Sequence, residues 1–332
     1  TEKEVVIPDT LPYQGTEFPV VEIGNRAFQS TNITSIDMPD TITRIGLDAF
    51  ASCHSLEKVR LSSNVTTLND RAFQNCQALE EITLPTKLTS IGANAFDGCT
   101  NLQSITLPKT LKSIGESAFE DSGLIQIQLP SSLAQIGGRA FAACESLYFA
   151  SISGNLSRLP NELFEDCTSL VTVDMPTGIT ALGTSVFKSC SSLITAALPE
   201  SVQTIGSSTF ENCRSLKNVT LSDKLTIIPE RTFYNCASLL NVTWPNMLAR
   251  IDDYAFYGCS SMRYVLLKEG FKTIGDYSFY GCTRLQSLTL PNSLTTIGDY
   301  AFQNCQSIES LTFGTSLKSI GRYAFSGCTG LK

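Results

Sequence analysis

The sequence predicts an α/β repeat solenoid, a stack of about 14 coils of 23 residues each. Two observations predict it. Fourteen phenylalanines, from Phe28 to Phe325, recur at intervals of 23 residues, or of 22 in two cases, and all 12 cysteines follow one of them by three residues. About eight of the 23 positions in a unit are apolar or small. Because these are too few for a core within one unit, neighbouring coils are expected to share a continuous core.

The unit after Cys99 shows the expected elements in order. Ile105 and Leu107 alternate with polar residues, which predicts a short strand with both apolar side chains on one face. Proline follows this strand in eight units, as at Pro108, and ends strand pairing because it has no N–H to donate. Equivalent strands of neighbouring coils are expected to pair in parallel at ~4.8 Å.

The segment 115–119 is expected to form a short helical turn. Its first position is glycine in most units and proline at Pro160 and Pro229. Since proline fixes a negative φ, this position resembles the first residue of a helix. The turn is expected to end just before the cysteine, where residues such as Asn75 and Gly98 tolerate a left-handed backbone.

Composition excludes several classes of protein. The 42% hydrophobic and 17% charged content is typical of a folded chain. A net charge of −7 argues against binding to nucleic acid and against docking on anionic lipid. The sequence contains no run of some 18 apolar residues, which is the length that would predict a transmembrane segment. One histidine in 332 residues limits general-base catalysis. Residues 1–4 show no signal-peptide pattern, so a signal peptide is expected to have been removed or never included.

The repeated pattern L-x-x-I-x-L-P-x-x-L-x-x-I-G-x-x-A-F-x-x-C covers the chain from about Phe18 to its end. It resembles the BspA-like, or Treponema-type, leucine-rich repeat family. The resemblance implies a right-handed superhelix, with a parallel β-sheet on the concave face and short helical or 3-10 turns and irregular segments opposite. It also implies a secreted or surface-attached protein associated with adhesion and host-protein binding, with no catalytic residues to carry over.

The resemblance also suggests how the chain is divided. Residues 1–24 look like the family's N-terminal cap segment, in which a hairpin-like extension leads into the first coil. Residues 25–332 are expected to form one continuous domain of leucine-rich repeats. The final CTGLK stops before its strand residues, so the last repeat is expected to be truncated and the natural polypeptide to be longer.

The cysteines permit a zinc site, disulfides, a reactive thiol or a structural ladder. Zinc needs closely spaced cysteine pairs or histidines to complete four ligands, and neither occurs. Disulfides between neighbouring coils remain an alternative, because the Cα atoms of in-register cysteines would lie ~5 Å apart, which a disulfide can bridge. A ladder of buried, reduced thiols agrees best with the burial preference of cysteine. Its members are Cys53, Cys76, Cys99, Cys144, Cys167, Cys190, Cys213, Cys236, Cys259, Cys282, Cys305 and Cys328.

Where Phe28 and Phe119 lack the following cysteine, the turn is also one residue shorter, so the cysteine belongs to the geometry of the turn. His54 follows Cys53, but it occupies a variable position that we expect to be exposed. The carboxylate pairs 80–81 and 252–253 are expected to be solvated surface, without a pocket that would shift their pKa values. The sequence therefore predicts no catalytic residue, no metal site and no cofactor.

The outward strand positions form two columns that are rich in Thr, Ser and Asn. Two clusters interrupt this polar background, and exposed aromatic residues and arginine are typical of binding hot spots. The alternative is an imperfect repeat whose aromatic residues lie over their neighbours. The clusters form a candidate surface for a partner and consist of Ile125, Tyr148, Phe149, Arg263, Tyr264 and Leu266.

Seven tyrosines recur at fixed coil positions near the C-terminus and are expected to stack as two ladders on the side away from the strands. Two roles are consistent with this spacing: the stacks stabilise the fold, or they contact a glycan or another partner. The ladders consist of Tyr254, Tyr277, Tyr300 and Tyr323, and of Tyr234, Tyr257 and Tyr280.

These observations predict a non-enzymatic protein that is secreted or displayed at the cell surface. It is expected to be a monomer that binds a protein or glycan, with host extracellular matrix as one candidate, through its concave sheet face. The alternative is a structural spacer, a stiff rod that presents another domain and has no specific ligand of its own. An enzyme of a new type is a third, more distant reading.

Overall fold

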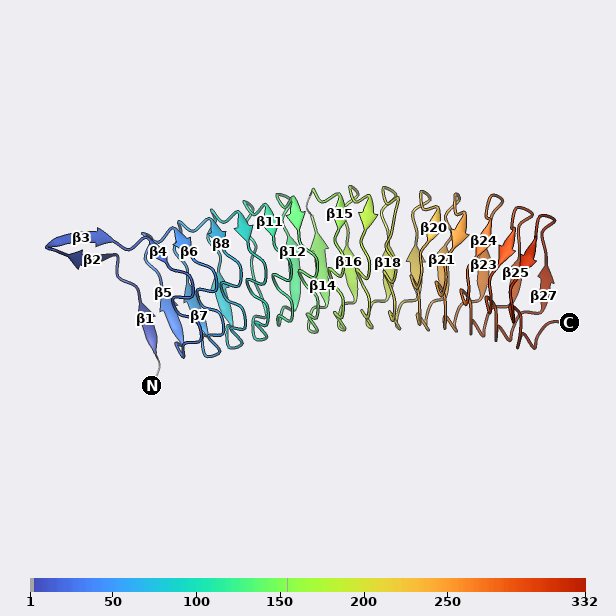
Figure 1. Ribbon diagram of the computed structural model, residues 1–332, viewed down its shortest axis with the longest axis horizontal. Helices are drawn as coiled ribbons and strands as arrows, with labels where there is room; N and C mark the ends of the chain where they lie inside the picture. The colour runs from blue at the N-terminus through green and yellow to red at the C-terminus, as the bar shows by residue number, and fades with distance from the viewer. Residues whose placement is uncertain (1–2, 154) are drawn as a thin grey trace. The chain divides into compact units, whose positions relative to one another are not determined.

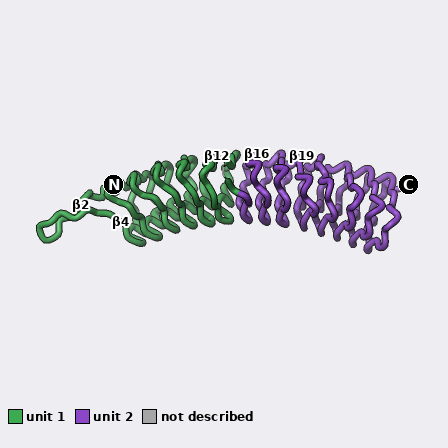
Figure 2. Tube along the Cα trace, turned by 90° about the horizontal axis from the view of Figure 1, so that it is seen from above, with its two compact units in different colours: residues 1–156 green, residues 157–332 purple. Residues whose placement is uncertain are grey.

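The computed structural model, drawn in Figure 1, describes residues 3–153 and 155–332. The chain divides into two compact units, residues 1–156 and residues 157–332 (Figure 2). Each unit is a parallel β-solenoid, and together they contain about 13 turns of about 23 residues. The predicted solenoid is confirmed, but the α/β class is wrong, because the described residues contain no helix. The single continuous domain and the right-handed winding stay predictions.

The predicted strands of the first unit form what we call the major sheet. Its strands run parallel and in register, in the orders β1-β5-β7-β9 and β12-β14. The strand expected around Ile105 is not present, because residues 102–108 have no regular secondary structure. The strands are β1 (Glu4–Val6), β5 (Ser35–Asp37), β7 (Lys58–Arg60), β9 (Glu81–Thr83), β12 (Gln126–Leu129) and β14 (Phe149–Ile152).

A second parallel sheet, which the sequence pattern did not predict, lies in the same unit. We call it the minor sheet. Each of its strands is two residues long and ends on the apolar residue that precedes the glycine position. The segments expected to be irregular are therefore partly strand. The strands are β4 (Glu22–Ile23), β6 (Arg44–Ile45), β8 (Thr67–Leu68), β10 (Ser90–Ile91), β11 (Ser113–Ile114) and β13 (Gln135–Ile136).

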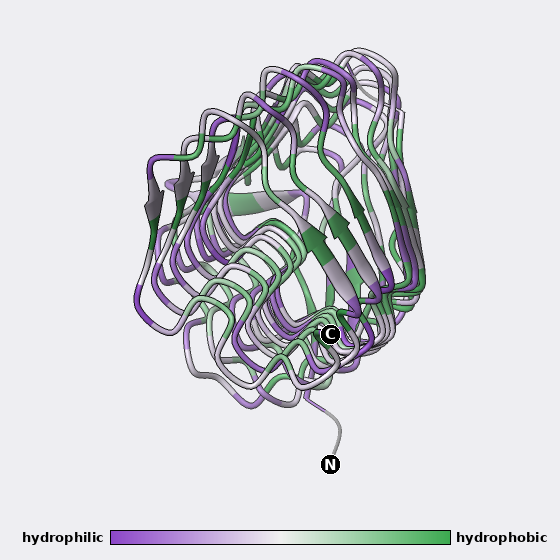
Figure 3. Cartoon of the chain, turned by 90° about the vertical axis from the view of Figure 1, so that its right-hand side faces the viewer, coloured by the Kyte–Doolittle hydropathy of each residue, from purple (hydrophilic) through white to green (hydrophobic). Residues whose placement is uncertain are grey.

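The second unit repeats both sheets, and Figure 3 shows their strands on different sides of its turns. Its major-sheet strands are β16 (Thr172–Asp174), β18 (Thr195–Ala197), β19 (Asn218–Thr220), β21 (Asn241–Thr243), β23 (Tyr264–Leu266), β25 (Ser287–Thr289) and β27 (Ser310–Thr312). Its minor-sheet strands are β15 (Arg158–Leu159), β17 (Ala181–Leu182), β20 (Ile227–Ile228), β22 (Arg250–Ile251), β24 (Thr273–Ile274), β26 (Thr296–Ile297) and β28 (Ser319–Ile320).

The predicted helical turns are replaced by successive tight turns. In the coil around Phe73, Arg71 and Asn75 both have a φ of +57°, in the left-handed region. The N–H groups of Arg71, Phe73 and Asn75 donate to carbonyl oxygens of the next coil at 2.7–2.9 Å. Ala72 and Gln74 between them donate within the segment, three residues back, at 3.2 and 3.3 Å. Every second N–H thus leaves the segment, which an α-helix does not allow.

Gly115, which opens this segment in its coil, permits a close approach of two neighbouring coils. Gly115 does not have a positive φ, in agreement with the prolines found at this position in other coils. A Cβ atom on Gly115 would lie 2.5 Å from the backbone nitrogen of Ala93, in the preceding coil. Glycine therefore lets the coils stack at β-sheet spacing.

Stacked phenylalanine rings form the centre of both units. Phe50, Phe73 and Phe96 are fully buried, and their ring centroids are 5.2 and 5.5 Å apart with nearly parallel planes. The second unit has an equivalent stack, in which the ring centroid of Phe279 lies 5.1 Å from those of Phe256 and Phe302. Burial of these rings supplies much of the apolar area that a single coil lacks.

The predicted hairpin in the cap segment is confirmed. β2 (Thr10–Tyr13) and β3 (Thr16–Pro19) pair antiparallel as a sheet of two strands, with Gln14 and Gly15 at the tip in positive-φ conformations. The hairpin projects away from the first coil (Figures 1 and 2). β1, which precedes it, pairs with β5 and so adds a strand to the major sheet.

Candidate functional site

The outward face of the major sheet carries the candidate site. Strand residues alternate between interior and surface, as in β7, where Val59 is buried between the exposed Lys58 and Arg60. Because neighbouring strands pair without offset, equivalent residues stand side by side: Ser35 pairs with Lys58, and Asp37 with Arg60. The residue columns predicted from the repeat are therefore real columns within each unit.

Most of this face is polar and internally bonded. In the first unit, Arg60 forms an ion pair with Asp37 across the strands at 2.7 Å. In the second unit, Asn241 donates a hydrogen bond to the side-chain oxygen of Asn218 at 2.8 Å. Such cross-strand pairs satisfy the surface groups and keep an exposed sheet soluble.

The first predicted cluster is brought together in two neighbouring coils of the first unit. The Tyr148 N–H donates to the Ile125 carbonyl oxygen at 2.9 Å, which sets the two residues side by side. Ile125 is 39% exposed and Tyr148 is 48% exposed. Phe149, which pairs with Gln126, is half-buried, so it contributes only part of its ring to the surface.

The second predicted cluster is more exposed and lies on a single strand of the second unit. Tyr264 is 58% exposed and Leu266 is 61% exposed, and both point outward from β23 on either side of the buried Val265. The Tyr264 hydroxyl donates to the Gln286 side-chain oxygen of the next coil at 3.3 Å. Arg263 is exposed directly before the strand, so a cation, an aromatic ring and an aliphatic side chain lie together.

The residue-by-residue prediction missed further exposed apolar side chains. Val171, Ile194 and Leu240 of the second unit are exposed and occupy the coil position that Ile125 and Tyr148 occupy in the first. The Ile194 N–H donates to the Val171 carbonyl oxygen. Lys217, between Ile194 and Leu240 in this column, donates its N–H to the Ile194 carbonyl oxygen and accepts the N–H of Leu240. Counting back one residue from the start of each strand would have found this column from the sequence.

Every cysteine is a buried thiol in the described chain. Cys76 donates its S–H to the carbonyl oxygen of Phe50, in the preceding coil, at 3.2 Å. The same bond recurs in both units, at distances of 3.0–3.3 Å. The Phe50 carbonyl oxygen also accepts the N–H of Cys53, its own coil's cysteine, at 3.2 Å. The thiol therefore links each coil to the one before it.

Hydroxyl groups replace the thiol where the repeat has no cysteine. Thr31, three residues after Phe28, donates to the Phe28 carbonyl oxygen at 2.9 Å. Ser122, at the same place after Phe119, is buried with its Oγ 3.2 Å from the Sγ of Cys144. The position thus requires a small hydrogen-bonding side chain rather than the chemistry of sulfur.

Burial also holds the thiols in their protonated form. It raises the pKa of Cys76 and Cys99 far above the usual range for a thiol. At Cys328, in the last coil, burial raises the pKa to about 11. Because the thiolate is the nucleophilic form, these cysteines are poor nucleophiles at neutral pH.

Comparison with known proteins decides the family. A family model described as BspA type leucine rich repeat region matches residues 21–148, 135–263 and 249–332. The chain belongs to the BspA-type leucine-rich repeat family. A leucine-rich repeat protein from Bacteroides ovatus ATCC 8483 has a similar structure, with a TM-score of 0.81 and 30% identity over 99% of this chain and 85% of that one. None of the curated proteins matches the chain.

A second solved structure adds a cellular context for its own protein. A leucine-rich cell surface protein from Faecalibacterium prausnitzii A2-165 matches 93% of this chain and 87% of its own, with 26% identity and a TM-score of 0.51. Both solved structures are of leucine-rich proteins from bacteria. The resemblance seen in the sequence is thereby confirmed.

The tyrosines at the C-terminal end of the BspA-type repeats stack as predicted. Tyr277 lies 4.9 Å from Tyr254 and 4.6 Å from Tyr300, with nearly parallel rings. Tyr257 lies 4.8 Å from both Tyr234 and Tyr280 in the second ladder. Because each ring covers its neighbour's face, mainly ring edges and hydroxyl groups reach the surface. The ladders therefore offer little flat aromatic area for stacking against a sugar.

The remaining candidate residues are not assembled into a catalytic arrangement. His54 is exposed, as predicted, whereas the neighbouring Cys53 is fully buried and donates to Phe28. Asp252 is only partly exposed, and burial raises its pKa, which corrects the prediction of an unshifted surface pair. Arg250 pairs with this carboxylate at 2.8 Å.

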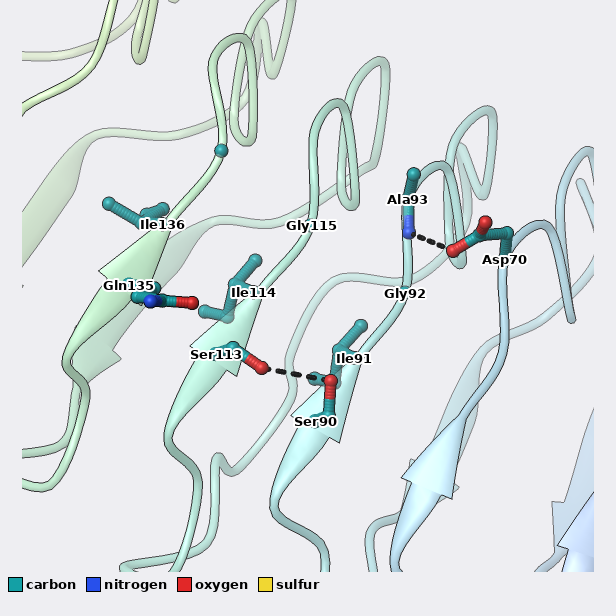
Figure 4. A pocket seen from close by; sticks show the side chains of 11 residues that line it. Asp70, Ser90, Ile91, Gly92, Ala93, Ser113, Ile114, Gly115, Gln135 and Ile136 are labelled. Carbon is teal, nitrogen blue, oxygen red and sulfur yellow. Dashed lines mark hydrogen bonds between the residues drawn. The ribbon is translucent and has the colours of Figure 1, made fainter.

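A shallow groove of about 400 Å³ crosses β10, β11 and β13 of the minor sheet (Figure 4). Three of its polar side chains make hydrogen bonds within the fold. Asp70 accepts the Ala93 N–H at 2.8 Å, and Ser113 donates to Ser90 at 2.9 Å. Across residues 3–153 and 155–332, no three His, Cys, Asp or Glu side chains gather as a metal site, and there is no helix long and apolar enough to cross a bilayer.

Proposed function

We propose that this BspA-type protein is a non-enzymatic binding protein whose major sheet presents a surface to a protein or glycan. The contact residues we assign are Arg263, Tyr264 and Leu266 in the second unit, with Ile125 and Tyr148 in the first. Phe149 supports Tyr148 from its half-buried position. Extracellular matrix is one candidate class of partner.

The exposure of Tyr264 and Leu266 carries this proposal. Both side chains are more than half exposed, on a sheet whose equivalent positions in the next two coils are Ser and Thr. Keeping two large apolar groups in water is unfavourable by about 1–3 kcal/mol each relative to burial. An adjacent arginine adds the residue type that most often completes a binding hot spot.

Two observations support a role without catalysis at the cell surface. The thiols are buried and protonated, and the one histidine stands alone on the surface. The similar F. prausnitzii protein is described as a cell surface protein, which supports an exported location for this chain as well.

Substitution of the second cluster tests the proposal. The variant Y264S/L266S is compared with wild type for binding to immobilised extracellular-matrix proteins and to a glycan array. We expect binding to fall by about 30-fold or more, because loss of one hot-spot residue typically costs about 2 kcal/mol.

The control variant S287A/T289S changes the paired positions of the next coil, where the side chains are small. It is expected to bind as wild type does. Equal binding by wild type and Y264S/L266S, or binding to no probe by either, would instead favour the spacer function.

A further inference from the structure

The hairpin β2–β3 exposes an apolar face that the fold itself does not cover. Register pairs Leu11 with Phe18 and Tyr13 with Thr16, so Leu11, Tyr13 and Phe18 lie on the same face. Their side chains are 55%, 65% and 51% exposed. The Tyr13 and Phe18 rings touch edge to face, with centroids 6.4 Å apart.

A ribbon of this kind is weak by itself. Two-stranded hairpins are marginally stable in water unless a further strand or layer packs on them. β2 and β3 pair with no other strand in the described chain, and all of residues 10–19 are exposed. Figures 1 and 2 both show the hairpin standing clear of the coils of its unit. An apolar face held out in this way is expected to gain stability from a partner.

Prolines block the outer edges of the hairpin. The Val20 N–H donates to the Asp9 carbonyl oxygen at 2.9 Å, so the 9–20 and 11–18 pairs are the hydrogen-bonded ones. Pro12 and Pro19 therefore occupy positions whose backbone nitrogen faces outward, one on each strand. Neither can donate to an added strand, so edge-to-edge pairing is disfavoured and contact must be made through the face.

The charge of residues 4–25 indicates which kind of partner is suited to this face. Residues 4–25 contain Glu4, Asp9, Glu17 and Glu22 and no lysine or arginine. Arg44 pairs with Glu22 at 3.0 Å, but Asp9 and Glu17 stand exposed on the hairpin or at its base. A second copy of the chain would bring like charges together, and an anionic lipid surface would repel them. A basic partner would complement them.

We propose that the β2–β3 hairpin is a docking site for a protein partner that presents an apolar surface bordered by lysine or arginine. The site is separate from the major sheet. Leu11, Tyr13 and Phe18 form the contact, and Asp9 is two residues before Leu11, on the same face by strand alternation. Glu17, which pairs with Pro12 on the opposite face, adds to the negative charge that attracts a basic partner. A typical stable interface covers about 800 Å² on each partner, so three large side chains imply a transient complex.

Synthetic peptides supply a defined probe for the test. A labelled 14-residue peptide of alternating Lys and Leu presents, as an extended strand, one apolar and one basic face. Alternating Glu–Leu and Lys–Ser peptides remove the charge match and the apolar side chains in turn. Fluorescence anisotropy at physiological salt measures binding to the whole chain, and we expect the Lys–Leu peptide to bind about tenfold or more tightly than either other peptide.

Matched variants separate this site from the rest of the surface. L11S/Y13S/F18S is expected to weaken Lys–Leu binding about tenfold or more, and D9K/E17K to weaken it as well. The control L47S/M247S alters exposed apolar residues elsewhere and is expected to bind as wild type. Unfolding followed through Trp244 checks that every variant keeps its fold.

Three results would overturn the proposal. Unchanged Lys–Leu binding by L11S/Y13S/F18S would place the contact elsewhere. Self-association of wild type that this variant abolishes, measured by sedimentation, would make a second copy the occupant. Flotation of wild type, but not the variant, with phosphatidylglycerol vesicles would make lipid the occupant. Because the major sheet is untouched in these variants, failure here leaves the proposed sheet function standing.

Discussion

Replacement of one ring in the phenylalanine stack tests how the coils are held together. Phe210 is fully buried in the second unit. Its ring centroid lies 5.4 Å from that of Phe187 and 5.5 Å from that of Phe233, with planes 12° and 1° apart. The substitution Phe210→Ala removes a side chain that contacts three coils at once.

The expected effect follows from burial and stacking. A buried Phe→Ala change typically lowers the free energy of unfolding by about 3–5 kcal/mol. Each aromatic pair adds about 0.5–1.5 kcal/mol beyond the buried area, and two pairs are lost here, so the upper part of that range applies. Phe210→Leu keeps most of the apolar volume and is expected to lose about half as much.

Urea unfolding measures the effect of the substitution on stability, because a tryptophan lies in the same compact unit as Phe210. Trp244, the sole tryptophan, is buried with its ring 5.4 Å from that of Phe256 and reports on the packed core. With an m-value of about 3 kcal/mol/M, a loss of about 4–5 kcal/mol should lower the midpoint of Phe210→Ala by about 1.3–1.7 M. A midpoint equal to that of the surface control T220S would refute the view that stacked rings hold the coils together.

Three further predictions rest on the thiols and on one carboxylate. Thiol titration with a coloured reagent should find few reactive thiols in the native protein and close to 12 after denaturation; nearly 12 in both states would contradict the buried ladder. Cys213→Ser should keep the bond to the Phe187 carbonyl oxygen and lower the unfolding midpoint less than Cys213→Ala, which leaves that oxygen short of a donor at a cost of about 1 kcal/mol; the reverse order would show that the bond does not matter. The hydrogen bond from Arg71 lowers the pKa of Asp48 below its ordinary 3.8, so this stabilisation is complete above that pH and is lost as pH falls through the folded-state pKa. Stability measured from pH 6 to pH 2 should therefore fall less steeply for D48N than for wild type, and equal slopes would argue against this role.

Residue spacing was enough to predict the interior and the columns of the major sheet. A period of 23 with alternating Ile and Leu fixes which side chains turn inward, and one in-register pair, such as that of Ser35 with Lys58, then fixes the column. The candidate surface followed from the same counting. Phe149 shows its limit, because the pattern places it outward but does not say how far its ring lies against the neighbouring coil.

The turn around each phenylalanine could not be predicted in this way. Every second N–H of this turn bonds to a carbonyl oxygen 21 or 22 residues further on, as that of Arg71 does to Ala93, so local helix signals such as glycine or proline at the first position were misleading. The same long-range bonds hold bulky residues such as Tyr254 and Tyr277 at φ values of +58° and +54°, which a sequence reading does not expect.

The sequence by itself determined the repeat, its buried phenylalanines and cysteines, and which strand residues face outward on the major sheet, because these depend only on spacing and polarity. Only the tertiary structure decided that the opposite segments form a second sheet and left-handed turns, and that the hairpin stands free with three apolar side chains exposed. The physical reason is that hydrogen bonds between coils select these conformations, whereas the local conformational preferences of a segment of about seven residues do not.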